Sequence, residues 1–326
     1  MKKDMASAIL KVLEAGIFLL ISSASFAQGY PAQPIKLVIG FTAGSGPDVA
    51  GRIVGPRLSE VLGKPVLIEN RGGAGGSIAT GMVAKAPPDG YTLIMLSASD
   101  TLQPALRPDL PYDLERDLAP VALLITAGFP LIVNPSVPAK NVQELIALAK
   151  AQPGKLRYGS SGVGSSAHLA GELFKLLAKV DLEHIPYKGT ADSGQATMAG
   201  QIEVSFSSIA AAKPLADAGK IRVLGVTSAS RSPAMPSVPS IGEAVPGYDR
   251  SVWYGIAAPA ATNKEVINTL NKSFASVTNM VPVKDALNKV GLYPKTLTPE
   301  EFGAFIKNQV IQNSQVVKAI GLKADD

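Results

Sequence analysis

The chain has 326 residues, of which 46% are hydrophobic and 17% are charged, and its formal net charge is +5. This composition excludes an intrinsically disordered chain, and the length favours two lobes over a single hydrophobic core. Lys and Arg are dispersed without basic runs, so no nucleic-acid partner is expected. The absence of cysteine and the presence of only two histidines exclude disulfides, thiolate catalysis and most metal sites. We therefore expect no cofactor and no metal.

The N-terminus predicts export. Lys2 and Lys3 precede an apolar run at 15–21, and Ser25 and Ala27 have the small-x-small spacing of a cleavage site before Gln28. An uncleaved membrane anchor is the alternative, but the apolar run is short for a membrane span. The sequence thus predicts a signal peptide over 1–27 and a soluble mature chain.

Strands and helices alternate along the rest of the chain, which is typical of α/β architecture. The pattern predicts strands, in chain order, at 35–40, 66–70, 91–96, 121–126, 131–133, 156–159, 182–186, 202–206, 222–227 and 252–257. It predicts helices at 47–62, 77–85 and 142–151, and two or three more within 264–318. The expected fold is two-lobed, each lobe a mainly parallel sheet flanked by helices. Residues 28–130 with 252–326 would form lobe I, residues 131–251 would form lobe II, and two crossings between them would act as a hinge.

Two segments share one design: a short strand, a loop of Gly and Ser, and the first turn of a helix. They are residues 35–48 and residues 156–168, here called the two cradles. The first turn of a helix presents unpaired backbone N–H groups and a partial positive charge, which suit an anion. We therefore expect a cleft that closes on a small anion from both sides.

The ends of the predicted strands carry hydroxyl groups rather than acids and bases. In open α/β sheets, ligands lie beyond the carboxyl ends of the strands, so a hydroxyl wall there would bind a polar ligand without reacting with it. For four residues the structural alternative stays open. Asp48 would only complement the helix dipole, Lys188 would be a solvated surface lysine, and Ser208, with Ser207, would cap a helix.

Two enzyme functions are alternatives to a ligand-binding function. Residues 162–167 (GVGSSA) match the G-x-G-x-x-A form of the dinucleotide fingerprint, although the loop is richer in Ser than that motif needs. His168 beside Ser165 or Ser166 suggests a hydrolase, but the sequence has no G-x-S-x-G nucleophile elbow. His184 lies in an apolar strand and is expected to be packed.

Motifs along nearly the whole mature chain resemble the substrate-binding proteins of tripartite tricarboxylate transporters, the TctC or Bug family. The resemblance is carried by 34–41 with Gly44, Gly46, Asp48 and Arg52, and by 66–71, 73–76, 88–93, 133–138, 158–161, 168–174, 184–189, 226–228 and 253–255.

This resemblance implies a periplasmic, two-lobed Venus-flytrap protein of the Gram-negative type. It would capture a small mono- or dicarboxylate and deliver it to the permease subunits of a membrane transporter, as a monomer without catalytic residues. It also implies that the Asp48 loop, the loop at 160–166 and neighbouring strand ends form the pocket, and it favours a pocket role for Asp48. Ser45 and the pair Ser207 and Ser208 depart from the family pattern, so the ligand's identity cannot be transferred.

The predicted ligand-binding residues come from both cradles and from the strand ends. They are Phe41, Thr42, Ala43, Gly44, Ser45, Gly46, Asp48, Ser97, Ser99, Ser160, Ser161, Gly164, Ser165, Ser166, His168, Tyr187, Lys188, Thr190, Ser207 and Ser208. The alternatives are a secreted hydrolase or dinucleotide-dependent enzyme, and a sensing module that signals through a receptor.

Overall fold

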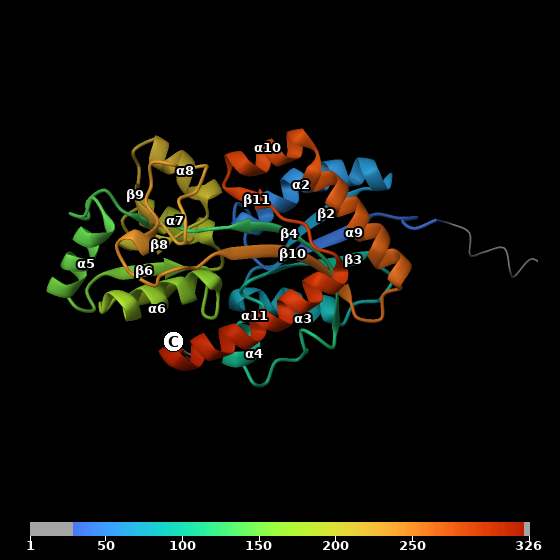
Figure 1. Ribbon diagram of the computed structural model, residues 1–326, viewed down its shortest axis with the longest axis horizontal. Helices are drawn as coiled ribbons and strands as arrows, with labels where there is room; N and C mark the ends of the chain where they lie inside the picture. The colour runs from blue at the N-terminus through green and yellow to red at the C-terminus, as the bar shows by residue number, and fades with distance from the viewer. Residues whose placement is uncertain (1–28, 323–326) are drawn as a thin grey trace, which may run out of the picture.

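The computed structural model describes residues 29–322 (Figure 1). The predicted signal peptide, residues 1–27, lies outside the described residues. Two lobes lie side by side, and each is a β-sheet between layers of helices, as expected for a two-lobed α/β protein. In the part of the chain that the structure describes, no helix combines the length and the apolar character that crossing a membrane requires.

Lobe I contains a six-stranded sheet with the order β11-β4-β10-β3-β1-β2. Its strands are β1 (Ile35–Ile39), β2 (Val66–Asn70), β3 (Thr92–Ser97), β4 (Leu118–Ala127), β10 (Val252–Pro259) and β11 (Leu292–Pro294). Its helices are α2 (Gly46–Leu62), α3 (Ser77–Ala84), α4 (Gln103–Leu106), α9 (Lys264–Asn279), α10 (Val281–Lys289) and α11 (Pro299–Ile320), with a 3-10 turn, η2 (Ala74–Gly76).

Lobe II contains a five-stranded sheet with the order β7-β6-β8-β5-β9. Its strands are β5 (Pro130–Val133), β6 (Arg157–Ser160), β7 (Glu183–Pro186), β8 (Val204–Phe206) and β9 (Arg222–Val226). Its helices are α5 (Val142–Ala151), α6 (Ser166–Ala178), α7 (Thr190–Met198) and α8 (Ile209–Asp217), with a 3-10 turn, η3 (Ile241–Glu243).

The expectation of mainly parallel sheets needs correction, because both sheets are mixed. In lobe I, β1 is parallel to β2 and β3, but β10 is antiparallel to β3 and β4, and β11 is antiparallel to β4. In lobe II, β6 is parallel to β7 and β8, but β5 is antiparallel to β8 and β9. A helical crossover returning to the same sheet enforces parallel strands. The chain segments that enter β5 and β10 come from the other lobe, so that constraint does not act on them.

The two connections between the lobes lie side by side. The chain leaves the first sheet after Ala127 and enters the second at Pro130, and it returns to the first at Val252. The N–H of Phe129 donates to Thr227 Oγ1 (2.9 Å), and the N–H of Thr227 donates to the Phe129 carbonyl (2.8 Å). Paired connections of this kind have the geometry of a hinge. The lobe boundaries predicted at 130/131 and 251/252 fall beside these changeovers and stay predictions.

The order of elements brings several helix starts to the cleft between the lobes. α2 follows β1, α6 follows β6 and α7 follows β7, each after a short loop. Proline in the first turn of α2 favours a helix start there. Proline lacks a backbone N–H, but the first turn needs none for bonds within the helix, and the φ of proline is already helical. Ser165 caps α6 by accepting the N–H of His168 (3.1 Å). Local residues therefore determine at which position each helix begins, and the arrangement of the strands places these helix N-termini at the cleft.

Candidate ligand-binding cleft

A small cavity of about 20 Å³ lies between the lobes. It is lined by Phe41, Ser45, Pro47, Ser97, Ser99, Phe129, Ser161, Ser166, Thr190, Val252 and Tyr254. Hydroxyl groups dominate this wall, and none of these residues from the described chain carries a charge. A volume of this size holds about one water molecule. Entry of a larger molecule therefore requires the lobes to move apart.

Three helix N-termini meet at this cavity. Ser45 and Pro47 begin α2, Ser166 begins α6 and Thr190 begins α7, and all four residues line the wall. Within the described residues, neither α2 nor α7 has a side-chain cap on its first-turn N–H groups. Unpaired N–H groups and aligned peptide dipoles make such positions favourable for anions. The predicted cradles of both lobes thus face one shared cavity.

The lobes touch through polar contacts at the rim of the cavity. The N–H of Ser166 donates to Ser99 Oγ (2.9 Å), and the two serine hydroxyls lie 3.1 Å apart. Gln103 Nε2 donates to the Gly164 carbonyl (2.9 Å). Thr42 Oγ1 donates to Asp192 Oδ2 (2.9 Å). These contacts join lobe I to the loop of α6 and to the first turn of α7, so they belong to the closed arrangement.

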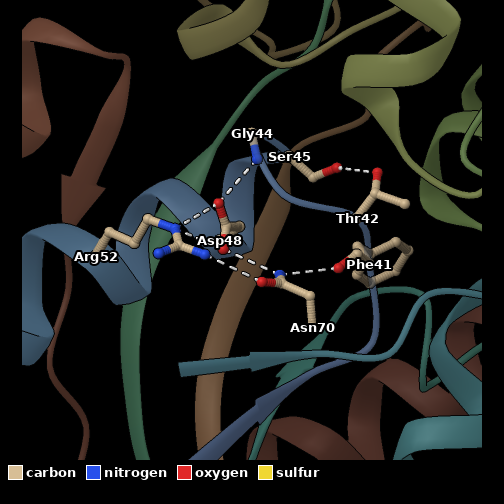
Figure 2. A network of polar contacts seen from close by, with 7 residues as sticks. All are labelled: Phe41, Thr42, Gly44, Ser45, Asp48, Arg52 and Asn70. Atoms are coloured by element: carbon tan, nitrogen blue, oxygen red, sulfur yellow. Dashed lines mark hydrogen bonds and ion pairs between the residues drawn. The ribbon is translucent and has the colours of Figure 1, made fainter. Parts of the chain in front are cut away.

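Asp48 is buried inside lobe I and does not line the cavity. Its carboxylate accepts the N–H of Gly44 (2.8 Å), Asn70 Nδ2 (2.9 Å) and Arg52 Nε (3.0 Å), as Figure 2 shows. Burial alone would raise the pKa of Asp48, but the hydrogen bonds from Arg52, Gly44 and Asn70 outweigh it and hold that pKa below its usual value. Asp48 therefore stays ionised, and its charge is satisfied behind the first loop.

The same network fixes the shape of the first loop. Asn70, at the end of β2, also donates to the Phe41 carbonyl (3.0 Å) and accepts from Arg52 Nη2 (3.2 Å). The start of the loop, at Phe41, is therefore held by the Asn70 amide, and its later part, at Gly44, is held by the Asp48 carboxylate. Phe41 and Ser45 line the cavity, whereas Thr42, Ala43 and Gly44 do not. Gly46 packs against the Tyr254 hydroxyl.

The second loop divides its serines between the cavity and the interior of lobe II. Ser161 and Ser166 line the cavity, and Ser165 is the cap of α6. Ser160 is buried and lies 2.7 Å from His184 Nε2, and its hydroxyl also accepts the N–H of Gly162 (3.1 Å). Gly164 meets lobe I through Gln103.

His168 lies behind this loop and is not part of a serine–histidine pair. Its Nδ1 accepts the N–H of Gly164 (3.2 Å), while Ser165 bonds only to its backbone. Burial, together with the nearby His184 and Lys175, lowers the pKa of His168 to about 3, so its ring is neutral. The dinucleotide-like motif at 162–167 contacts lobe I, since the Gly164 carbonyl accepts a hydrogen bond from Gln103 and the N–H of Ser166 donates to Ser99.

The remaining predicted residues surround α7 and α8. Thr190 lines the cavity, and its hydroxyl is buried without a hydrogen-bond partner in residues 29–322. Ser207 donates to the Thr190 carbonyl (3.1 Å), and Ser208 caps α8. Tyr187 is half-buried and Lys188 is exposed, and neither lines the cavity.

Four wall residues were not predicted from the sequence: Pro47, Phe129, Val252 and Tyr254. Phe129 belongs to the first connection between the lobes, and Val252 and Tyr254 are on β10. Every residue of β10 is buried, so in the sequence it is indistinguishable from a core strand. Burial raises the pKa of Tyr254, which keeps its hydroxyl protonated and able to donate. Within residues 29–322, no group of His, Asp or Glu is arranged to hold a metal ion.

Comparison with known proteins gives consistent matches over nearly the whole described chain. The profile described as the tripartite tricarboxylate transporter family receptor, TctC, matches residues 50–322. Protein BugT of Bordetella pertussis is 33% identical over 94% of this chain and 96% of its own length. The R. palustris protein Rpa4515, solved with adipate, has a TM-score of 0.87 and 34% identity over 90% of this chain and 99% of its own. MatC from Rhodopseudomonas palustris, solved with bound malate, has a TM-score of 0.84 and 29% identity over 88% and 100%.

A buried acid behind the wall makes the stability of the protein depend on pH. The Asp100 carboxylate accepts hydrogen bonds from Thr80 Oγ1 (2.5 Å) and from the N–H of Ser97 (2.8 Å). Burial raises the pKa of Asp100 to about 6. The protonated form is therefore favoured in the folded state, and this stabilisation is complete below about pH 4 and lost as the pH rises through 6. Asp100→Asn keeps both contacts, because its amide can donate to Thr80 and accept from Ser97.

We expect the free energy of unfolding of Asp100→Asn, relative to wild type, to increase between pH 4 and pH 7 by an amount on the order of 3 kcal/mol. Urea unfolding at several pH values measures this difference. Asp109→Asn, at an exposed position, is the control and should show no such trend. A difference for Asp100→Asn that is constant across this pH range would contradict the assignment.

Proposed function

We propose a function from one premise: the chain belongs to the tripartite tricarboxylate transporter receptor family, TctC, whose members are solute-binding proteins. The family resemblance expected from the sequence is thereby confirmed. In our proposal the protein is exported to the periplasm, captures a small organic carboxylate between its lobes and delivers it to the permease subunits of a membrane transporter. The adipate and malate of the two R. palustris proteins support the carboxylate class.

The observation that carries the proposal is the chemistry of the cavity wall. Hydroxyls of Ser45, Ser161 and Thr190 and the N-termini of α2, α6 and α7 all converge on it. Hydroxyl and amide hydrogens complement carboxylate oxygens, and the aligned helix dipoles favour the negative charge. The apolar rings of Phe41 and Phe129 supply a surface for a carbon skeleton.

Two donors have the strongest claim to a ligand oxygen. The Thr190 hydroxyl is buried and unpaired among residues 29–322, and a buried donor left in this state costs about 1–3 kcal/mol. The Tyr254 hydroxyl lies against Gly46 in the first turn of α2, on the opposite side of the cleft. A carboxylate between them would accept from both lobes at once, and its binding would favour closure.

The strength of such binding is moderate. About five hydrogen bonds to a charged ligand, at roughly 1.5–3 kcal/mol each, less association and ordering costs of several kcal/mol, correspond to an affinity near micromolar. No permanent ion pair is needed, which suits a protein that must release its ligand to a transporter.

The first experiment identifies the ligand. Mass spectrometry of small molecules that copurify with the protein, together with a thermal-shift screen of organic acids, sugars and amines, should identify a small carboxylate. A response to sugars or amines, with none to any carboxylate, would exclude the proposal.

Removing either donor should weaken binding without harming the fold. We expect Thr190→Val and Tyr254→Phe each to raise the Kd for adipate or malate, whichever wild type binds, by about 10-fold to 100-fold, since each loses one hydrogen bond to a charged group. Isothermal titration calorimetry measures the change. Tyr293→Phe, whose hydroxyl contacts Ser232 away from the cavity, is the matched control and should bind like wild type.

A single methyl group at the rim should prevent closure. Gly189 has a φ of −164°, which any residue adopts, but a Cβ there would collide with Thr42 Oγ1 and lie 2.5 Å from Ser45 Oγ across the cleft. We expect Gly189→Ala to fold normally and to bind its carboxylate at least 10-fold more weakly.

Small-angle scattering measures the same closure directly. Ligand should reduce the radius of gyration of wild type but not of Gly189→Ala. The control is Gly303→Ala on α11, where a Cβ would make an ordinary contact with Pro120. Equal compaction of Gly189→Ala and wild type would show that this contact does not limit closure.

A further inference from the structure

The only two histidines of the chain stack on each other inside lobe II. The rings of His168 and His184 lie 3.8 Å apart between centroids with an interplanar angle of 10°, and Tyr158 packs beside both. The pair lies directly behind residues 161–166, here called the cradle loop. Neither ring lines the cavity, so the proposed ligand contacts do not explain the pair.

Each ring is linked to a different part of the cradle loop, His168 directly and His184 through Ser160. His168 Nδ1 accepts the N–H of Gly164 (3.2 Å). His184 Nε2 is joined to Ser160 Oγ (2.7 Å), which in turn accepts the N–H of Gly162 (3.1 Å). The two imidazoles therefore hold the two glycines of the loop from the rear.

The loop needs such a restraint because of its backbone. Gly162 and Gly164 have φ values of 105° and 74°, a region that glycine enters readily and leaves as readily. Ser161 and Ser166, on either side of these glycines, present their side chains to the cavity. A change of conformation at Gly164 would move its carbonyl, which accepts a hydrogen bond from Gln103 of lobe I.

We propose that His168 is a positioning residue: its Nδ1, as an acceptor, sets the conformation of the cradle loop that presents Ser161 and Ser166 to the ligand. The consequence for affinity rests on the proposed function, whereas the hydrogen bond itself does not. His184 supports the assignment by covering one face of the His168 ring.

The acceptor role requires a neutral ring, and the surroundings provide for one. Burial is the main cause that lowers the pKa of His168 to about 3, and the adjacent His184 ring and Lys175 contribute to the same shift. On α6, Lys175 is itself paired with Glu172 (3.0 Å), and Tyr158 of β6 donates to the same carboxylate (2.7 Å). A neutral His168 ring keeps the Nδ1 lone pair that accepts the Gly164 N–H.

The first test observes this nitrogen in the protein without added ligand. In a sample labelled with ¹⁵N at histidine, four ring nitrogens are observed, and His168→Asn assigns them. We expect His168 to carry its proton on Nε2, with Nδ1 unprotonated, from pH 8 down to about pH 5. A proton on Nδ1, or a titration near pH 6.5, would overturn the proposal.

The second test uses a matched pair of variants. Asn places an acceptor oxygen near the position of Nδ1, whereas Leu has a similar size and no acceptor. We expect the Gly164 amide hydrogen to exchange about 10-fold faster in His168→Leu and to stay within about 3-fold of wild type in His168→Asn. The Kd for adipate should follow the same order.

The outcomes separate the two proposals. If wild type binds no carboxylate, the proposed function fails, but the exchange rates still decide the role of His168. Equal exchange rates in the Asn and Leu variants would refute the positioning role. Melting temperatures and circular dichroism check that each variant is folded, and if the Leu variant does not fold, the nitrogen signals of wild type decide.

Discussion

Three helices start at one cavity, and their first-turn N–H groups have no carbonyl of their own helix to bind. This constraint follows from helix geometry, because the first four N–H groups of any helix lack an internal partner. For α6 the chain supplies Ser165 and, from the other lobe, Ser99. For α2 and α7 no side chain among residues 29–322 does so. Donors left in this state at a cleft are complemented by the oxygens of an anion, and a fixed cation is not required.

Two acids near the cavity lie behind its wall and are held there by hydrogen bonds. Asp48 stays ionised, but Arg52, Asn70 and the Gly44 amide satisfy it, and its side chain is 2% exposed while that of Arg52 is 55% exposed. Asp100 is buried, and burial raises its pKa to about 6, so its negative charge is suppressed only in acid and returns as the pH rises through 6. Both carboxyl groups accept hydrogen bonds from loops that reach the wall.

The sequence is informative where a short-range signal decides the structure. The helix predicted at 142–151 matches α5, and its start is set locally by Asn141, whose side chain caps it by accepting the N–H of Glu144. The two cradles and most of the serines on the wall follow from strand, glycine loop and helix start, which are also local. The direction of a side chain is not local: Asp48 and His168 were predicted in the pocket, and the structure turns both into networks behind the loops.

Wall residues from the crossing segments could not be predicted for a related reason. Phe129, Val252 and Tyr254 reach the cavity only because β10 enters the first sheet between β3 and β4 and because the two connections pair. This pairing joins positions far apart in the chain, and nothing in the apolar run of β10 distinguishes it from any other core strand. The antiparallel direction of β5 and β10 has the same origin.

The central place of β10 in lobe I has a consequence for the order in which the molecule assembles. β3 and β4 do not pair with each other, and they join one sheet only when residues 252–259 form β10 between them. The sheet of lobe II, in contrast, comes from one continuous stretch, from β5 to β9. During synthesis, which starts at the N-terminus, lobe II can therefore complete its sheet first, while lobe I must wait for β10 and β11 in the last quarter of the polypeptide.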